Sequence, residues 1–344
     1  MTEWKECKLG DVIVLNYGKA LPEKKRVFGN IPVYSSAGLT GYHNESLVNG
    51  RGIIIGRKGT IGSVHFSYKP FWCIDTAYYI TDNEEYNLKY IYYLLQTLGL
   101  NELNEDSAVP GLNRNTAYQQ DISFPPLPEQ KAIAEVLSSL DDKIDLLTRQ
   151  NKTLEDLAQA YFRKWFIEDA SDKWEEIPLG QLFVISSGKG LKKEKFTEHG
   201  QYRVLGANGE IGKTNEYLFN ERLIYTGRVG TLGNVFIVDR EPVWLSDNTL
   251  VFRNIKYFFF VYFSLKWANL ADYNVGSTQP LIRQSDIKEI RVFMPDKERL
   301  DSFENLANSI FAKINSNQKQ IQLLQKLRDT LLPKLISGEI RVKM

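Results

Sequence analysis

Side chains that could contact an anion recur in this 344-residue chain, in two glycine-spaced loops of the same form. GRKGTIG occupies residues 56–62 and GRVGTLG occupies residues 227–233. Arg57, Lys58 and Arg228 belong to these loops, and cations of this kind are suited to contact phosphate. Neither loop has the GxxxxGKS/T pattern of a P-loop or the GxGxxG pattern of a dinucleotide site. The glycines therefore indicate either a tight turn alone or a turn that presents cations to phosphate.

Other basic and amide side chains follow the same duplication. Lysine-rich runs stand after GKAL (18–21) and GKGL (188–191), where they are either solvated surface or phosphate contacts. Arginine pairs with guanine and Asn or Gln pairs with adenine in bidentate fashion, so guanidinium and amide groups in later loops are suited to base edges. The basic set is Lys19, Lys24, Lys25, Arg26, Lys189, Lys192, Lys193 and Lys195. The base-edge set is Asn113, Arg114, Asn115, Gln279, Arg283 and Gln284.

Nothing in the sequence indicates a catalytic centre. It contains no nucleophile elbow, no Cys/His pair and no carboxylate constellation. The stretch SFPPLPEQ (123–130) fails the N/D-P-P-F/Y/W motif of amino-methyltransferases, because Phe124 and Leu127 occupy the deciding positions. Asp75 and Asp247 are interpreted as turn or cap residues. The three histidines are isolated, so we expect no metal and no cofactor.

The composition is typical of a globular protein, with 43% hydrophobic and 12% aromatic residues. No apolar run approaches the roughly 20 residues that span a bilayer. The N-terminus lacks the apolar stretch of a secretory signal, and the two cysteines, Cys7 and Cys73, lie far apart. We therefore expect a protein of the reducing cytoplasm. The net charge of +1 favours no class of partner, so any nucleic-acid surface must come from local patches.

The chain is a tandem duplication with a period of roughly 170 residues. WKECKLGDVIVLNYGKAL (4–21) aligns with WEEIPLGQLFVISSGKGL (174–191), and SAVPGLNR (107–114) aligns with STQPLIRQ (277–284). Each copy begins with short β-branched and aromatic runs and one helical pattern, and it ends in a long helix. We expect an α+β fold with two similar globular domains, residues 1–126 and 171–295. Helical spacer regions are expected at residues 127–170 and 296–344.

Both long helices carry apolar residues in heptad spacing, as in Ile133, Leu137, Leu140, Ile144 and Leu147. This pattern predicts an antiparallel two-helix coiled coil related by a pseudo-twofold axis. A helix of about 38 residues extends roughly 57 Å.

Asn151 and Asn317 fall on these seams. They are expected to face each other and set the register of the helix pair, unless one of them is solvated in a loose seam. Pro333 should kink or end the second helix.

Taken together, these motifs resemble the specificity (S) subunits of type I restriction-modification systems. The resemblance rests on GRKGTIG, PPLPEQKAIAEVLSSLDDKIDLL (125–147), YFRKWF (161–166) and LLPKLISGEIRV (331–342). It implies a non-catalytic subunit with two target-recognition domains, each reading one half of a split double-stranded DNA sequence. It also implies that the helices set the unread gap and dock two methyltransferase (M) subunits, with restriction (R) subunits attached through the complex.

The two copies differ in the loops that this resemblance places on DNA, so we expect an asymmetric target. The pair Asn16-Tyr17 aligns with Ser186-Ser187, Ser35-Ser36 with Ala207-Asn208, and Asn113-Arg114 with Arg283-Gln284. Tyr17, Ser35, Ser36 and Asn208 therefore join the expected DNA-binding residues. The second long helix begins with MPDKE (294–298) and lacks the Glu-Gln pair of the first.

Two other interpretations of the sequence stay open. The first is a DNA methyltransferase or nuclease whose globular domains carry the chemistry. A requirement of the isolated chain for S-adenosylmethionine would favour it. The second is a coiled-coil adaptor that binds proteins. It predicts no sequence-dependent retention of DNA and no loss of affinity as salt rises.

Overall fold

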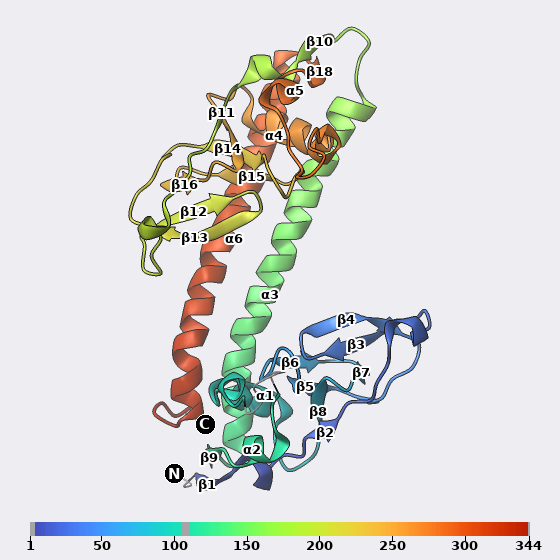
Figure 1. The fold of residues 1–344 in the computed structure, drawn as a ribbon, viewed down its shortest axis with the longest axis vertical. Coiled ribbons are helices and arrows are strands. Elements are labelled where there is room, and N and C mark those ends of the chain that lie inside the picture. Colours follow the sequence, from blue (N-terminus) through green and yellow to red (C-terminus); the bar gives the residue numbers. More distant parts are fainter. Residues whose placement is uncertain (1–3, 105–110, 343–344) are drawn as a thin grey trace. The chain divides into compact units, whose positions relative to one another are not determined.

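The structure, a computed structural model, describes residues 4–104 and 111–342. The chain forms two compact units (Figure 1). The first unit comprises residues 1–148 and 318–344, and the second comprises residues 149–317. Each long helix is divided between the two units. The four consecutive domain ranges expected from the sequence stay a prediction. Residues 107–110 of the SAVPGLNR stretch lie outside the described residues.

Among its described residues, the first unit contains three small sheets and three α-helices that begin in it. β1 (Lys5–Lys8) pairs antiparallel with β9 (Asp121–Phe124). A four-stranded antiparallel sheet has the order β2 (Asn16–Tyr17), β8 (Ala77–Thr81), β5 (Gly52–Gly56) and β6 (Val64–Ser67). A three-stranded sheet has the order β4 (Gly38–His43), β3 (Ile31–Ser35) and β7 (Trp72–Cys73). The helices are α1 (Leu88–Thr97), α2 (Arg114–Tyr118) and α3 (Leu127–Arg163), of which α3 continues into the second unit.

The second unit repeats this topology strand for strand. β10 (Glu175–Pro178) pairs with β18 (Arg291–Met294). The four-stranded sheet has the order β11 (Val184–Ser187), β17 (Thr249–Arg253), β14 (Leu223–Gly227) and β15 (Val235–Val238). The three-stranded sheet has the order β13 (Gly209–Thr214), β12 (Tyr202–Gly206) and β16 (Val243–Leu245). The helices are α4 (Phe258–Trp267), α5 (Gln284–Lys288) and α6 (Lys297–Ile336). The predicted α+β tandem repeat is therefore confirmed.

A fully buried central strand explains why the sequence just before each glycine loop is continuously apolar. Successive side chains of a strand point to opposite faces. In β5, Ile53 and Ile55 pack in the cluster that contains α1, whereas Ile54 packs with Phe71 and Cys73 of the three-stranded side. Both faces of the strand are thus covered, and all five of its residues are buried. Burial raises the pKa of the Cys73 thiol to about 12.

The long helices pack in the antiparallel sense (Figure 1). In the second unit, the start of α6 packs on the end of α3 through Phe303, Ala307, Ala158 and Phe162. In the first unit, the last turns of α6 pack with Ile133 and the rest of the α3 start. The 37 residues of α3 and the 40 residues of α6 agree with the predicted helix lengths.

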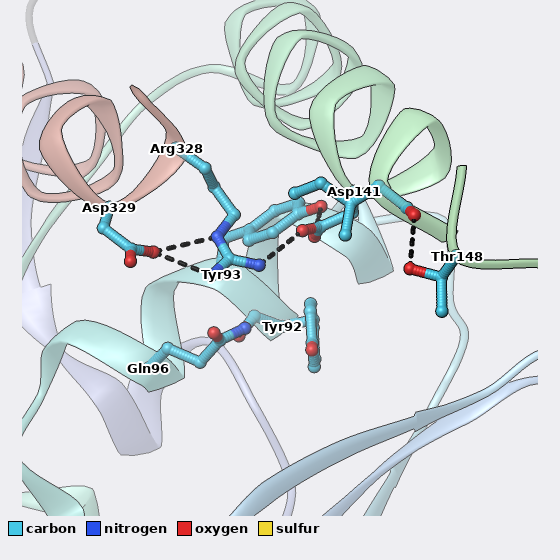
Figure 2. Close-up of polar contacts among 8 residues, drawn as sticks. Tyr92, Tyr93, Gln96, Asp141, Thr148, Arg328 and Asp329 are labelled. Atoms are coloured by element: carbon cyan, nitrogen blue, oxygen red, sulfur yellow. Dashed lines mark hydrogen bonds and ion pairs between the residues drawn. The ribbon is translucent and has the colours of Figure 1, made fainter. Parts of the chain in front are cut away.

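In the first unit, polar contacts also join the two helices (Figure 2). The Tyr93 hydroxyl of α1 donates to Asp141 Oδ2 at 2.7 Å, and Arg328 Nη1 of α6 donates to Asp141 Oδ1 at 2.8 Å. Asp329 accepts from Nε and Nη2 of Arg328 at 2.9 and 2.8 Å. Burial, together with the hydrogen bond to Asp141, raises the pKa of Tyr93. The Asp141 carboxylate thus links α1, α3 and α6.

Two sequence expectations concern single residues of the long helices. In the second unit, Asn317 is fully buried and its Nδ2 donates to Asn151 Oδ1 and to Gln150 Oε1, both at 2.8 Å. The two seam asparagines are in contact, and their role in setting register stays a prediction.

Pro333 does not end α6, which runs on to Ile336. A proline so close to the C-terminus of a helix removes a single intrahelical donor, and the helix has only three residues left.

No helix in the described part of the chain is long and apolar enough to cross a membrane.

Candidate nucleic-acid interface

Three segments that lie far apart in the sequence meet on the first unit. Tyr17 ends β2, Arg57 follows β5, and Arg114 begins α2. The guanidinium carbons of Arg57 and Arg114 lie 5.0 and 5.1 Å from the centroid of the Tyr17 ring. With Lys58 and Asn113, these residues line a recess of about 200 Å³. Five residues that the sequence assigns to phosphate or base contact are therefore brought together.

Backbone hydrogen bonds hold the three segments in this arrangement. The Leu112 amide donates to the Arg57 carbonyl at 2.8 Å, and Lys58 forms an antiparallel bridge with Gly111. The hydroxyl of Tyr78, from β8, donates to the Leu112 carbonyl at 3.0 Å. Because this bond comes from a buried side chain, it fixes the segment just before Asn113 to the sheet.

The glycines of the loop are required by its geometry. A Cβ atom on Gly56 would stand 1.9 Å from the Thr60 carbonyl oxygen, and one on Gly227 would stand 2.1 Å from that of Thr231. Gly59 has a φ of +79°, a region that favours glycine. The tight-turn interpretation therefore holds in both copies, and each turn places an arginine directly after the first glycine.

The surroundings of the first cluster are aromatic as well as basic. The Tyr78 ring lies 5.1 Å from the Tyr17 ring in a T-shaped contact and 5.8 Å from the Arg57 guanidinium carbon. Burial raises the pKa of Tyr78, and the neighbouring Tyr17 raises it further. Arg57 Nη1 donates to the Asp75 carbonyl at 3.0 Å. The cluster thus combines guanidinium groups with aromatic rings, and a contact of this kind is worth about 0.5–1 kcal/mol at exposed sites.

The second unit brings the equivalent positions together with different side chains. Ser187 ends β11, Arg228 follows β14, and Gln284 begins α5. Gln284 Nε2 donates to Ser187 Oγ at 3.1 Å, and Arg228 Nη1 lies 3.5 Å from the same oxygen. The frame is the same as in the first unit, because the Ile282 amide donates to the Arg228 carbonyl at 3.0 Å. Val229 and Leu281 form the matching bridge.

Most of the remaining predicted residues are exposed but lie outside these clusters. Lys24 and Lys25 belong to a 3-10 turn over Glu23–Lys25, and Lys193 and Lys195 belong to the equivalent turn over Lys193–Lys195. Exposed residues elsewhere in the predicted set are Lys19, Asn115, Lys189, Lys192, Asn208, Gln279 and Arg283.

Some of these predicted residues already have partners on the protein. Lys195 is paired with Glu216 at 2.7 Å, and Asn208 accepts from Asn234 at 2.7 Å. Lys192 is paired with Glu194 at 3.7 Å. Their availability to an anion is correspondingly lower than that of Lys24 and Lys25.

Ser35 and Ser36, which were expected to contact DNA, are buried, and their contact with DNA stays a prediction. The Ser35 hydroxyl accepts from the Ala37 amide within the turn between β3 and β4. Ser36 accepts from Ser63 through its carbonyl oxygen. Arg26 is also engaged, because its Nη1 donates to the Thr40 carbonyl at 2.7 Å. All three residues therefore have hydrogen-bond partners in or beside the hairpin of β3 and β4.

Two members of the clusters are absent from the residues predicted as contacts. Tyr78 belongs to the apolar pattern of β8, and this pattern does not indicate that its hydroxyl donates to the Leu112 carbonyl. Ser187 is one of many serines, and only its alignment with Tyr17 in the repeat could have singled it out.

Each unit thus presents one polar cluster on a shared frame, which defines the chain as a tandem-repeat protein with one potential recognition site per repeat. The model of the type I restriction modification DNA specificity domain matches residues 1–156 and again residues 171–329. The chain belongs to this family, and the resemblance inferred from its motifs is confirmed.

Similar proteins agree with this assignment. The chain is 28% identical over 339 residues to the type I restriction enzyme MjaIX specificity subunit of Methanocaldococcus jannaschii, covering 85% of this chain and 78% of the relative. It is 26% identical over 367 residues to a putative type I specificity subunit of Mycoplasma genitalium, covering 96% and 93%. The crystal structure of a type I restriction-modification S subunit from M. genitalium matches the fold with a TM-score of 0.67 at 21% identity, over 99% and 96% of the two chains.

Proposed function

We propose that this chain is the sequence-specific DNA-binding subunit of a type I restriction-modification complex. Each unit reads one half of a bipartite, asymmetric target through the cluster described above. The observation that carries this proposal is that one backbone frame occurs twice with different side chains at its two variable positions, Tyr17 and Arg114 against Ser187 and Gln284. A protein that reads two unlike half-sites requires this combination of a repeated frame and differing contacts.

The long helices supply the rest of the proposed role. We infer that α3 and α6 set the length of unread DNA between the half-sites and carry the docking surfaces for two methyltransferase subunits, with restriction subunits joining through the complex. The chain itself takes part in no chemical step. The complex acts in the cytoplasm.

The near-neutral charge of the chain bears on its affinity. A net charge of +1 gives little long-range attraction to DNA, and non-specific affinity comes largely from phosphate contacts. We therefore expect the chain to bind DNA weakly alone and tightly with its methyltransferase partners.

Methylation mapping tests the proposal directly. Genomic DNA is sequenced from cells that express this chain with its cognate methyltransferase subunit, and from cells that express the methyltransferase alone. One split motif should appear only when both chains are present, and exchanging residues 1–126 or 171–295 for those of another family member should change one half of it. If both chains are soluble and no new motif appears, the proposal is wrong and the adaptor interpretation takes its place.

The alternative with catalytic domains has its own test. Binding of S-adenosylmethionine to the isolated chain, followed by calorimetry, distinguishes it from the specificity role. A dissociation constant in the micromolar range would support an enzyme.

A further inference from the structure

Each cluster has an arginine at the same place in the frame, but the two residues beside that arginine differ between the clusters. Arg57 and Arg228 occupy the same place after the first loop glycine, and the carbonyl of each accepts an amide from the segment that precedes the short helix. Tyr17 is replaced by Ser187, and Arg114 is replaced by Gln284. The shared residue and the variable residues therefore occupy different classes of position within one frame.

Contacts of protein to DNA divide in the same way. Phosphate contacts position a protein and carry no sequence information, whereas contacts to base edges specify sequence. A cation that is common to two unlike readers matches the first role. Side chains that differ between the two units, on a backbone frame that is the same in both, match the role of contacts to base edges.

Arg114 is held in a manner that favours base recognition. Its guanidinium carbon lies 5.1 Å from the Tyr17 ring centroid and 5.9 Å from that of Tyr118. Contact with the ring face restrains a planar guanidinium while its N–H donors stay in the plane. Arg114 Nε is buried, so the donors that remain for a base edge are those of the two terminal nitrogens, Nη1 and Nη2. A pair of N–H donors held in this way is complementary to the O6 and N7 acceptors of guanine.

Gln284 presents a different pattern from the same place. Its Nε2 donates to Ser187 Oγ at 3.1 Å, which orients an amide that has both donor and acceptor groups. Adenine presents the N6 donor and the N7 acceptor side by side in the major groove, and a glutamine amide matches this pair. A serine in place of Tyr17 leaves no ring face against which an arginine could stack.

We propose that Arg114 and Gln284 are equivalent base-reading residues of the two repeats. Arg114 specifies a guanine in the half-site of the first unit, and Gln284 specifies an adenine at the corresponding position of the other half-site. Tyr17 and Ser187 act as their positioning residues. This inference rests on the proposed function, because it assigns the bases that the two clusters read.

Reciprocal substitutions in the full chain, co-expressed with its methyltransferase subunit, test the inference by methylation mapping. In R114Q, the motif should change from guanine to adenine at one position of one half, and methylation of the wild-type motif should fall about tenfold, the effect of losing one bidentate base contact. In Q284R, the new arginine has no ring on which to stack, so the motif should lose its adenine at one position of the other half and methylation of the wild-type motif should again fall about tenfold. Q119A and E289A are matched controls, because these exposed residues end α2 and α5 and should leave the motif unchanged.

The possible failures are distinguishable. If the wild-type chain yields no motif at all, the proposed function fails. If it yields a split motif that R114Q and Q284R leave unaltered, the specificity role stands and this inference is wrong.

If R114Q abolishes methylation entirely, the double variant Y17S/R114Q decides the outcome, because it copies the side-chain pair of the second unit into the first. Recovery of methylation with adenine at the altered position supports the reading role. A folded double variant, judged by its thermal unfolding, that methylates no motif assigns Arg114 to positioning and overturns the inference.

Discussion

The cluster of the first unit and that of the second unit show how one frame can carry two chemistries. In the first, two guanidinium groups lie over the Tyr17 ring, so the surface combines aromatic faces with positive charge. In the second, Ser187 joins an arginine and a glutamine through one hydroxyl oxygen, so the surface is smaller and polar. The backbone bonds behind both clusters are equivalent. The side chains of the clusters can therefore differ at strand ends and helix starts without disturbing the buried strands.

The starts of the two long helices differ as much as the clusters do. In the first unit, Glu129 is 2% exposed and accepts from the Trp4 indole at 3.0 Å and from Arg341 Nη2 at 2.7 Å. The strand registers place Arg299 at the matching position of the second repeat. Arg299 instead stacks on Trp174 at 5.3 Å and donates to the Trp165 carbonyl at 3.1 Å. The first helix start thus depends on an ion pair between a buried carboxylate and a partly exposed arginine, and the second depends on a stacked cation with backbone partners.

The largest expected effect on stability concerns the two helix starts. E129A should lower the free energy of unfolding by about 2 kcal/mol, because it removes the buried carboxylate that accepts from the Trp4 indole and from Arg341. R299A should cost only about 1 kcal/mol, since it removes a cation–π contact and bonds to carbonyls near the surface. Urea unfolding measures both variants. E135A, an exposed glutamate on the same helix, is the control and should change stability by less than about 0.5 kcal/mol. Equal losses in E129A and R299A would contradict the comparison.

The next effect concerns the residue that the two clusters share. R57A and R228A should each weaken binding of the methyltransferase complex to all DNA sequences by about tenfold and reduce the salt slope by about 1, as expected for lost phosphate contacts. Fluorescence anisotropy over a series of salt concentrations measures this. K69A removes an exposed cation elsewhere in the first unit and serves as the control. If R57A behaves like K69A, Arg57 does not contact phosphate.

A smaller effect should be confined to the first cluster. Y78F removes the hydroxyl bond to the Leu112 carbonyl and should destabilise the first unit by about 1 kcal/mol. The second unit has Leu250 at this position, so its frame has no equivalent tyrosine hydroxyl bond. Hydrogen exchange should quicken at the Leu112 amide of Y78F and stay unchanged at the Ile282 amide. Equal changes at both amides would mean that the hydroxyl does not fix the first frame.

The last effect is a pH dependence that both units share and that appears only at alkaline pH. Burial raises the pKa of Tyr86 in the first unit and of Tyr225 in the second to about 12, whereas an unfolded tyrosine titrates near 10. Between these values the folded chain holds protons that the unfolded chain has lost, so stability falls as pH rises. Unfolding free energies should begin to decline near pH 9, where the unfolded Cys73 thiol loses its proton, and should decline more steeply from about pH 10 toward pH 12. Y225F should make that decline shallower in the second unit only, and an unchanged slope would contradict the assignment.

Much of this architecture could be predicted from the sequence. The duplication, the antiparallel long helices and the α+β character of each copy follow from local apolar spacing, which the packing then satisfies. The Asn151–Asn317 contact could also be anticipated, because heptad spacing over two long helices leaves little freedom in which residues meet. The burial of Ser35 and Ser36 could not be predicted, since the sequence of a polar turn does not indicate whether its hydroxyls face water or the protein.

The sequence by itself therefore determined the tandem repeat, the family and the residue types available for phosphate and base contact. Only the tertiary structure decided which of those residues form a site. Tyr17, Arg57 and Arg114 belong to separate segments, and they meet because sheet pairing and the Leu112–Arg57 backbone bond bring those segments together. Local spacing cannot report such a meeting, because the contacts that create it join residues far apart in the chain.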